Sequence, residues 1–145
     1  MEHALELAHL GAQSQEVPVG AVLTYKGEIL AKAHNEIIQN NDPTAHAELL
    51  VLRRAAEKLE TPRLVGANLY VTLEPCPMCA QAIAFARIEK VFFGAYDPKG
   101  GGIDHGPKIF EQPTCHHDIQ VIGGLLEKEC GRILKDFFQK RRENS

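Results

Sequence analysis

Residues 68–95 read NLYVTLEPCPMCAQAIAFARIEKVFFGA, and this stretch decides the fold of the chain. It begins with one strand-like apolar run, Asn68–Leu73, and it ends with another, Val91–Ala95. Between the two runs, a pair of prolines opens a helix that we expect to continue to about Arg87. This order predicts a βαβ unit, in which two parallel strands are joined by a right-handed crossover.

The segments before and after this unit also alternate between helix and strand patterns. Apolar residues recur at helical spacing or in short runs, and Asp42-Pro43-Thr44 indicates a helix start. We therefore expect an α/β fold, a three-layer α/β/α sandwich with a mixed sheet of about five strands. The other expected elements are a helix to about Gln15, a hairpin of Val19–Tyr25 and Glu28–His34, a helix over Ala45–Leu59, a Gly-rich loop from Asp97 to about Pro113, a strand over Ile119–Ile122 and a closing helix from about Leu125 to Arg142.

Length and composition favour a single domain, residues 1–145. With 145 residues, 44% of them hydrophobic, the chain can bury roughly two-thirds of its unfolded surface. The N-terminus lacks a basic region, and no apolar run approaches the roughly 20 residues of a membrane span. We therefore expect no membrane contact and a cytoplasmic location. The formal net charge is −3, so any nucleic acid must bind a local basic patch.

Two short motifs, His46-Ala47-Glu48 and Pro75-Cys76-Pro77-Met78-Cys79, hold the candidate chemistry. One imidazole and two thiolates fill three corners of a zinc tetrahedron, and a catalytic site leaves the fourth corner to water. Glu48 is two residues from His46 and can reach that water. We therefore predict one Zn²⁺ held by His46, Cys76 and Cys79, with Glu48 as the group that moves protons.

Both motifs fall at expected helix starts. His46 and Glu48 lie in the first turn of one helix, and Cys76 and Cys79 lie three residues apart on one face of the next. Two helix N-termini are thus expected to converge on the metal. Their unpaired N–H groups and their dipoles lower the pKa of a thiol and favour the thiolate that zinc requires.

Other readings of the cysteine motif remain open. A lone Cys-x-x-Cys is also typical of a redox pair or of half a structural zinc site. Cys115, His116, His117 or Cys130 could supply a fourth ligand. A closed site would leave Glu48 without a role. Cys115 and Cys130 have no close cysteine partner in the sequence, so we expect both thiols to be inert.

Characteristic stretches are spread over nearly the whole chain. They are Glu16–Val22, Asn35, Asp42–Glu48, Leu69–Cys79 and Asp136–Arg142. The zinc motif among them, H-x-E with P-C-x-x-C, marks the wider cytidine deaminase-like superfamily. The other stretches are more particular, and with them the chain resembles the bacterial tRNA-specific adenosine deaminases.

This resemblance implies a cytidine deaminase-like fold and a specific reaction. The reaction is hydrolytic deamination of the wobble adenosine of a tRNA anticodon to inosine, by a homodimer with one Zn²⁺ per subunit. Residues that match the family's zinc ligands and its proton shuttle are His46, Cys76, Cys79 and Glu48. Residues that match its substrate contacts are Asn35 for the base, and Asp97 and Lys99 beside the anticodon loop.

A basic C-terminal end suits the phosphates of the tRNA stem, and it consists of Lys140, Arg141 and Arg142. Each substrate contact also has a simpler structural alternative. Asn35 could form a turn after a strand, and Asp97-Pro98 could form an exposed turn. The basic end could merely offset the dipole of the closing helix.

One stretch departs from the family pattern. After Lys99 the family usually continues with a Gly-Ala-x-Gly-Ser-type loop, whereas this chain has GGGIDHGP over Gly100–Pro107. The change keeps open a free nucleobase or nucleoside, such as guanine, cytosine or adenosine, as the substrate. A third hypothesis is a non-catalytic RNA-binding module stabilised by zinc with all four positions filled.

Overall fold

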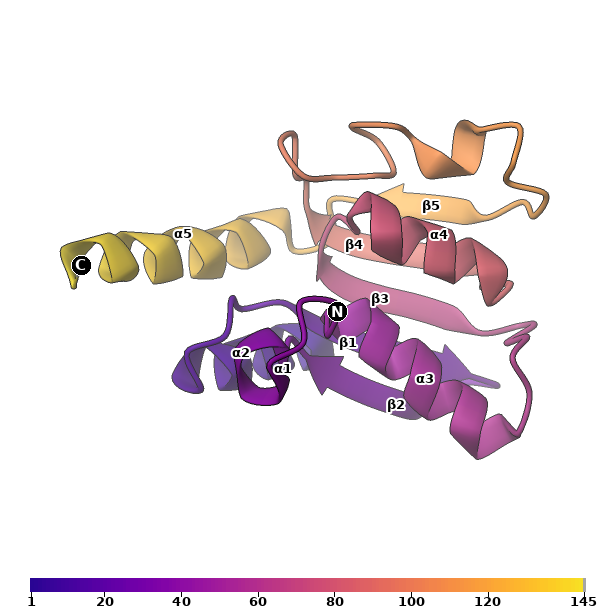
Figure 1. Ribbon diagram of the computed structural model, residues 1–145, viewed down its shortest axis with the longest axis horizontal. Coiled ribbons are helices and arrows are strands. Elements are labelled where there is room, and N and C mark those ends of the chain that lie inside the picture. The colour runs from indigo at the N-terminus through magenta and orange to yellow at the C-terminus, as the bar shows by residue number, and fades with distance from the viewer. Residues whose placement is uncertain (145) are drawn as a thin grey trace.

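A five-stranded sheet forms the centre of the computed structural model, which describes residues 1–144 (Figure 1). The elements are α1 (Glu2–Gln13), β1 (Gly20–Tyr25), β2 (Glu28–His34), α2 (Ile37–Asn40), α3 (Ala47–Leu59), β3 (Asn68–Leu73), α4 (Pro77–Phe85), β4 (Lys90–Ala95), η1 (Ile109–Glu111), β5 (Gln120–Gly123) and α5 (Glu127–Glu143). The strand order is β2-β1-β3-β4-β5. β1 pairs antiparallel with β2 and β3, whereas β3, β4 and β5 pair in parallel.

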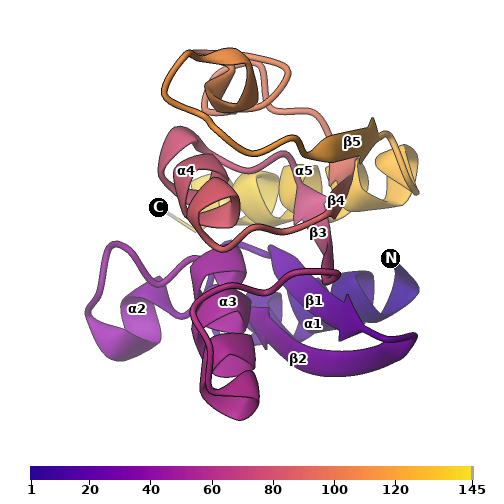
Figure 2. The ribbon, with the colours of Figure 1, turned by 90° about the vertical axis from the view of Figure 1, so that its right-hand side faces the viewer.

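Helices cover both faces of this sheet. α3 and α4 pack on one face, and α1 and α5 pack on the other, as the turned view in Figure 2 shows. The predicted three-layer α/β/α sandwich with a mixed sheet is therefore confirmed. Within residues 1–144, no helix is both long enough and apolar enough to cross a membrane.

Strand direction decides where the helices begin. β2 and β3 are both antiparallel to β1, so they run in the same direction and end at the same edge of the sheet. α3 follows β2 and α4 follows β3, and both helices therefore start near that edge (Figure 1). This arrangement brings the two sequence motifs together.

Three details differ from the expectations. The short helix α2 and the 3₁₀ turn η1 were not predicted, because segments of three or four residues carry no usable periodicity. α4 ends at Phe85 rather than near Arg87, since Arg87 adopts a left-handed conformation with a φ of 64°. The other predicted elements shift at their ends by no more than two residues.

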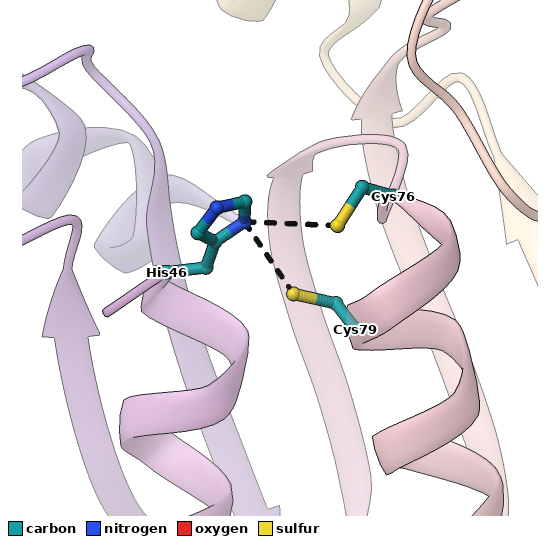
Figure 3. Close-up of side chains that lie close together, drawn as sticks. All are labelled: His46, Cys76 and Cys79. Carbon is teal, nitrogen blue, oxygen red and sulfur yellow. Dashed lines mark hydrogen bonds between the residues drawn. The ribbon is translucent and has the colours of Figure 1, made fainter. Parts of the chain in front are cut away.

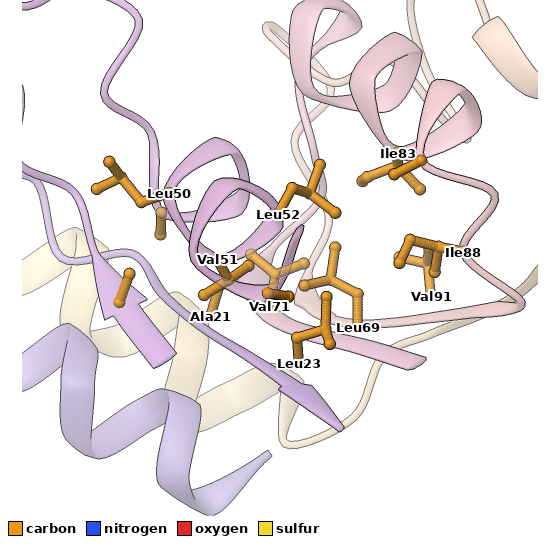
Figure 4. Close-up of a cluster of buried hydrophobic side chains, with 14 of the residues drawn as sticks. Ala21, Leu23, Leu50, Val51, Leu52, Leu69, Val71, Ile83, Ile88 and Val91 are labelled. Atoms are coloured by element: carbon orange, nitrogen blue, oxygen red, sulfur yellow. The ribbon is translucent and has the colours of Figure 1, made fainter. Parts of the chain in front are cut away.

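The main core lies between the sheet and the layer of α3 and α4 (Figure 4). Leu69 and Val71 of β3 are fully buried, and they meet Val51 of α3 and Ile83 of α4 in one apolar cluster. Alternate residues of the strand share a face of the sheet, which explains why every second side chain enters this cluster.

Two glycines allow close packing on the opposite face. A Cβ on Gly20 would clash with the carbonyl oxygen of Ala4 in α1. A Cβ on Gly94 would clash with the Sγ of Cys130 in α5 and would lie 2.7 Å from the carbonyl oxygen of Thr72. The helix layer of α1 and α5 therefore sits against the sheet only because both positions lack a side chain.

Replacing Gly20 by alanine should destabilise the fold by about 1–3 kcal/mol, the usual cost of overpacking, because backbone atoms must move. Gly131→Ala in α5 is the matched control, since a Cβ there meets nothing within 4 Å. Alanine is the better helix former, so this variant should gain roughly 0.8–1 kcal/mol. Chemical denaturation measures both changes, and a Gly20→Ala protein as stable as the parent would contradict the packing described.

Candidate metal centre

Three potential metal ligands, His46, Cys76 and Cys79, meet at the edge where α3 and α4 begin (Figure 3). His46 is the N-cap residue of α3, which starts at Ala47 and not at the predicted Ala45. Cys76 is the N-cap residue of α4. The two helix starts expected from the sequence thus lie side by side, and each contributes donors from its first turn.

The spacing of the donor atoms fits a tetrahedral metal ion. The Nδ1 of His46 lies 3.7 Å from the Sγ of Cys76 and 3.6 Å from the Sγ of Cys79. Bonds of about 2.0 Å to nitrogen and about 2.3 Å to sulfur, at tetrahedral angles, place such atoms about 3.5 Å apart. A metal ion can therefore be held by these three side chains with little movement.

The three donors share protons through their hydrogen bonds. The hydrogen bond with Cys79 lowers the pKa of Cys76 to about 4, and the imidazole of His46 adds to this effect. The same bond, together with burial, raises the pKa of Cys79, and the hydrogen bond with Cys76 raises the pKa of His46. Because metals bind the deprotonated forms, a cation takes the place of these protons when it binds.

The other candidate ligands lie elsewhere. Within residues 1–144, the metal-binding group contains only the three donors above. The Sγ of Cys115 donates to the carbonyl oxygen of His117, the ring of His117 donates to another backbone carbonyl 2.8 Å away, and His116 is exposed. Cys130 lies in the first turn of α5 and is buried, and burial raises its pKa to about 11. The structure does not form the closed four-ligand site.

Glu48 lies in the first turn of α3 with only 4% of its surface exposed. Burial raises the pKa of its carboxyl to about 7, against the opposing effects of its own backbone N–H and of His46. The carboxylate is not part of the metal-binding group, so it is a neighbour of the donors and not a fourth donor. A carboxyl that titrates near neutral pH can both accept and release a proton.

Asn35 follows β2 and is buried, with 6% of its surface exposed. Its Oδ1 accepts a hydrogen bond of 2.8 Å from the N–H of Ala47, the first residue of α3. The structural alternative to a base contact was a turn at Asn35, and the side chain instead caps α3 from a distance. Its Nδ2 has no hydrogen-bond partner within residues 1–144 and is left to donate to a ligand.

Asp97 and Lys99 lie in the loop after β4, at the same edge of the sheet as Cys76. The Oδ1 of Asp97 accepts a hydrogen bond of 2.9 Å from the N–H of Gly100, so Asp97 builds the turn anticipated at this position. Lys99 is exposed. The loop therefore presents the exposed side chain of Lys99 at the edge of the sheet that holds Cys76.

The basic residues Lys140, Arg141 and Arg142 lie in the last turn of α5. The C-terminal half of this helix projects beyond the sheet, at the edge where α3 and α4 begin (Figure 1). The guanidinium of Arg141 lies over the ring of Phe137, 5.2 Å from its centroid. These cations complement the helix dipole.

Sequence reasoning missed two buried glutamates, one of which holds α2 and the other the loop after β4. Glu16, with 1% exposure, accepts hydrogen bonds of 3.1 and 2.8 Å from the N–H groups of Ile38 and Gln39 in α2. Glu74, with 2% exposure, accepts hydrogen bonds from the loop after β4. The available signal was a single acidic residue directly beside an apolar strand-like run.

The whole chain resembles known deaminases. The model of the MafB19-like deaminase family matches residues 1–142. The tRNA-specific adenosine deaminase of Agrobacterium fabrum is 51% identical over 142 residues, which span 98% of this chain and 93% of the relative. The tRNA-specific adenosine deaminase of Bacillus subtilis is 47% identical over 143 residues, which span 99% of this chain and 89% of the relative.

A solved structure agrees with these sequence matches. It comes from a study of A-to-I editing by tRNA:A34 deaminases at the wobble position of transfer RNA, and it is 52% identical in sequence. It superimposes with a TM-score of 0.91 over 92% of this chain and 97% of that chain. The motifs, the fold and both kinds of similarity agree, and this chain belongs to the family of tRNA-specific adenosine deaminases.

Proposed function

We propose that this protein is a zinc-dependent hydrolase that converts the wobble adenosine of a tRNA anticodon to inosine. The observation that carries the proposal is the group of His46, Cys76 and Cys79 beside the buried, titratable carboxyl of Glu48. The names of relatives 51% and 47% identical to this chain support the substrate. The proposed active unit is the single domain of residues 1–145.

Zinc is the metal that best suits one imidazole and two thiolates, and the proposal assigns one ion to each subunit. When bound, it acts as a Lewis acid that makes water nucleophilic at neutral pH. Glu48 first transfers one proton of the attacking water to a ring nitrogen, and it then transfers the second proton of that water to the departing amine. The C–N bond at C6 of adenine breaks, ammonia leaves, and an oxo group remains.

Asn35 orients the base in this scheme. Its Oδ1 already accepts from the N–H of Ala47, so in this scheme Nδ2 faces the substrate as a hydrogen-bond donor. The base must therefore offer an acceptor, such as a purine ring nitrogen. The same side chain holds the backbone N–H of Ala47, the residue after His46. One amide group would therefore position both the base and the metal ligand His46.

The RNA contacts follow the edge of the sheet. A base in an unpaired anticodon loop can be splayed out over the metal without breaking a duplex. In the proposed complex, Asp97 and Lys99 contact the anticodon loop, and Lys140, Arg141 and Arg142 in the last turn of α5 contact phosphates of the stem. An enzyme of tRNA works where tRNA is, so the proposal places the protein in the cytoplasm.

The proposed active form is a homodimer. Met78 and Phe85 lie seven residues apart on α4, on one face of the helix, with 37% and 70% of their surfaces exposed. Val65, in the connection before β3, is also exposed, by 69%. Large exposed apolar side chains of this kind are typical of surfaces that contact another subunit.

A substrate panel tests the proposal against the free-base alternative that the Gly100–Pro107 loop leaves open. Ammonia release should be faster from an anticodon stem-loop than from adenosine, cytosine or guanine, by about 100-fold or more in kcat/KM, because remote contacts also lower the barrier. Each substrate is measured with the same zinc-loaded protein. Faster turnover of a free base would replace the proposed function with a nucleobase deaminase.

Glu48→Gln and Cys76→Ala form a pair that separates catalysis from metal binding. Glu48→Gln should keep zinc and fold while turnover falls by roughly 10²–10⁴-fold, the usual effect of removing a general acid–base group. Cys76→Ala should lose zinc, activity and thermal stability together, because metal binding is linked to folding. Metal analysis, calorimetry and turnover are measured on both, and zinc lost from the Glu48 variant would remove Glu48 from its assigned role.

The double variant Lys140→Ala and Arg141→Ala should weaken stem-loop binding. Two lost phosphate contacts should reduce the slope of log affinity against log salt concentration by about 1.4–1.8, because fewer counterions are released. Arg63→Ala with Lys90→Ala is the control that removes the same charge away from this edge. If the two double variants bind stem-loop RNA alike, the basic end merely offsets the dipole of α5.

A further inference from the structure

The buried carboxylate of Glu74 joins the start of α4 to the loop Asp97–His105, here named the 97–105 loop. Glu74 lies two residues before Cys76, and its side chain has no exposed surface. Its Oε1 accepts a hydrogen bond of 3.0 Å from the N–H of Asp97. Its Oε2 accepts hydrogen bonds of 3.2, 2.9 and 3.1 Å from the N–H groups of residues 103–105.

A side chain completes this set. The Nδ1 of His105 lies 2.8 Å from the Oε1 of Glu74, which gives the carboxylate five donors from one loop. The ring of His105 also meets the ring of Tyr96 edge to face, with 6.2 Å between the centroids. Both ends of the 97–105 loop are thus tied to the same two oxygen atoms.

The loop also rests directly on the turn that carries Cys76. The N–H of Gly102 donates to the carbonyl oxygen of Pro75 at 2.8 Å. A Cβ on Gly102 would lie 2.5 Å from the nitrogen of Pro77, and a Cβ on Gly101 would clash with the carboxylate of Glu74. Two consecutive glycines therefore allow the loop to lie against the metal-binding turn.

None of the five donors to Glu74 belongs to a helix or a strand. An ionised carboxylate is costly to bury unless donors satisfy it, and the five donors to this one come from the 97–105 loop. Its hydrogen bonds fix the conformation of one loop, and that loop contains Asp97 and Lys99. Glu74 therefore determines how these two candidate substrate contacts are positioned.

We propose that Glu74 is a positioning residue that holds the 97–105 loop in its RNA-binding conformation, next to the metal site. The inference rests on the proposed function, because it takes Asp97 and Lys99 as contacts to the anticodon loop. Three consecutive glycines, residues 100–102, give the free loop high conformational entropy. Glu74 removes that freedom in advance, so RNA binding does not have to order the loop.

Glu74→Gln tests this inference in the zinc-loaded enzyme. The variant places an amide N–H₂ group among N–H donors, so at least one charge-assisted bond is lost and the loop loosens. KM for an anticodon stem-loop should rise by about tenfold, the factor that corresponds to loss of one such bond, while kcat changes by less than about threefold. Zinc content should stay the same, and amide hydrogen exchange should accelerate over residues 97–105.

Glu89→Gln is the matched control, because it makes the same chemical change at an exposed residue next to the opposite end of β4. It should leave KM and hydrogen exchange in the loop unchanged. A Glu74→Gln enzyme with the parent's KM and the parent's loop exchange would overturn the inference. So would a variant that loses zinc or kcat with KM unchanged, since Glu74 would then serve the metal site.

His105 provides a second test that does not depend on how well the Glu74 variant folds. His105→Ala removes the ring donor and should raise KM severalfold, whereas His105→Asn places an amide N–H near the position of Nδ1 and should restore it. Equal KM values in the parent and both variants would refute the proposed coupling. A parent enzyme that fails to deaminate the stem-loop would instead refute the proposed function, so the two failures are distinguishable.

Discussion

The N-cap positions of α3 and α4 are occupied by His46 and Cys76, whose side chains face one another instead of capping their helices. Every helix start leaves backbone N–H groups without intrahelical partners, and buried N–H groups must find acceptors. For α3 the acceptor is the Oδ1 of Asn35, which reaches across from the end of β2. A metal site at two helix starts therefore requires polar side chains from other parts of the chain.

Sheet topology meets this requirement. β2, β3, β4 and β5 run in one direction, so the segments that follow them emerge at one edge. Open α/β sheets generally bind ligands at the carboxyl ends of their strands for this reason. Asn35 follows β2, Cys76 follows β3 and Asp97 follows β4, which is why residues far apart in sequence surround one site.

Contacts with Glu74 and with the turn at Pro77 explain several residues of the Gly100–Pro107 loop, which departs from the family pattern. Gly101 and Gly102 have no room for a Cβ, because the carboxylate of Glu74 and the turn at Pro77 lie against them. His105 adds a bond to the same carboxylate. Gly101, Gly102 and His105 of this unusual loop therefore make contacts inside the protein. Lys99, directly before the loop, stays exposed.

The βαβ unit, the hairpin and the metal-binding motifs could be predicted from the sequence, because they depend on local periodicity and on short spacings, and the family could be named from the resemblance of characteristic stretches along the chain. His46 and Glu48 are two residues apart and Cys76 and Cys79 are three apart, so a helix start is enough to place each pair. The sheet of the folded chain confirmed the predicted α/β/α sandwich, and the similarity to known relatives confirmed the family.

The strand order, the short helix α2 and the partners of the buried polar groups could be seen only in the folded chain. Asn35 bonds to a residue 12 positions away, Glu16 to one 22 positions away, and Glu74 to one 31 positions away. No local pattern encodes such contacts, because they exist only after the strands have paired and the loops have met at one edge. The metal-binding residues could be read from the chain, whereas the side chains that hold them in place could be found only in the folded protein.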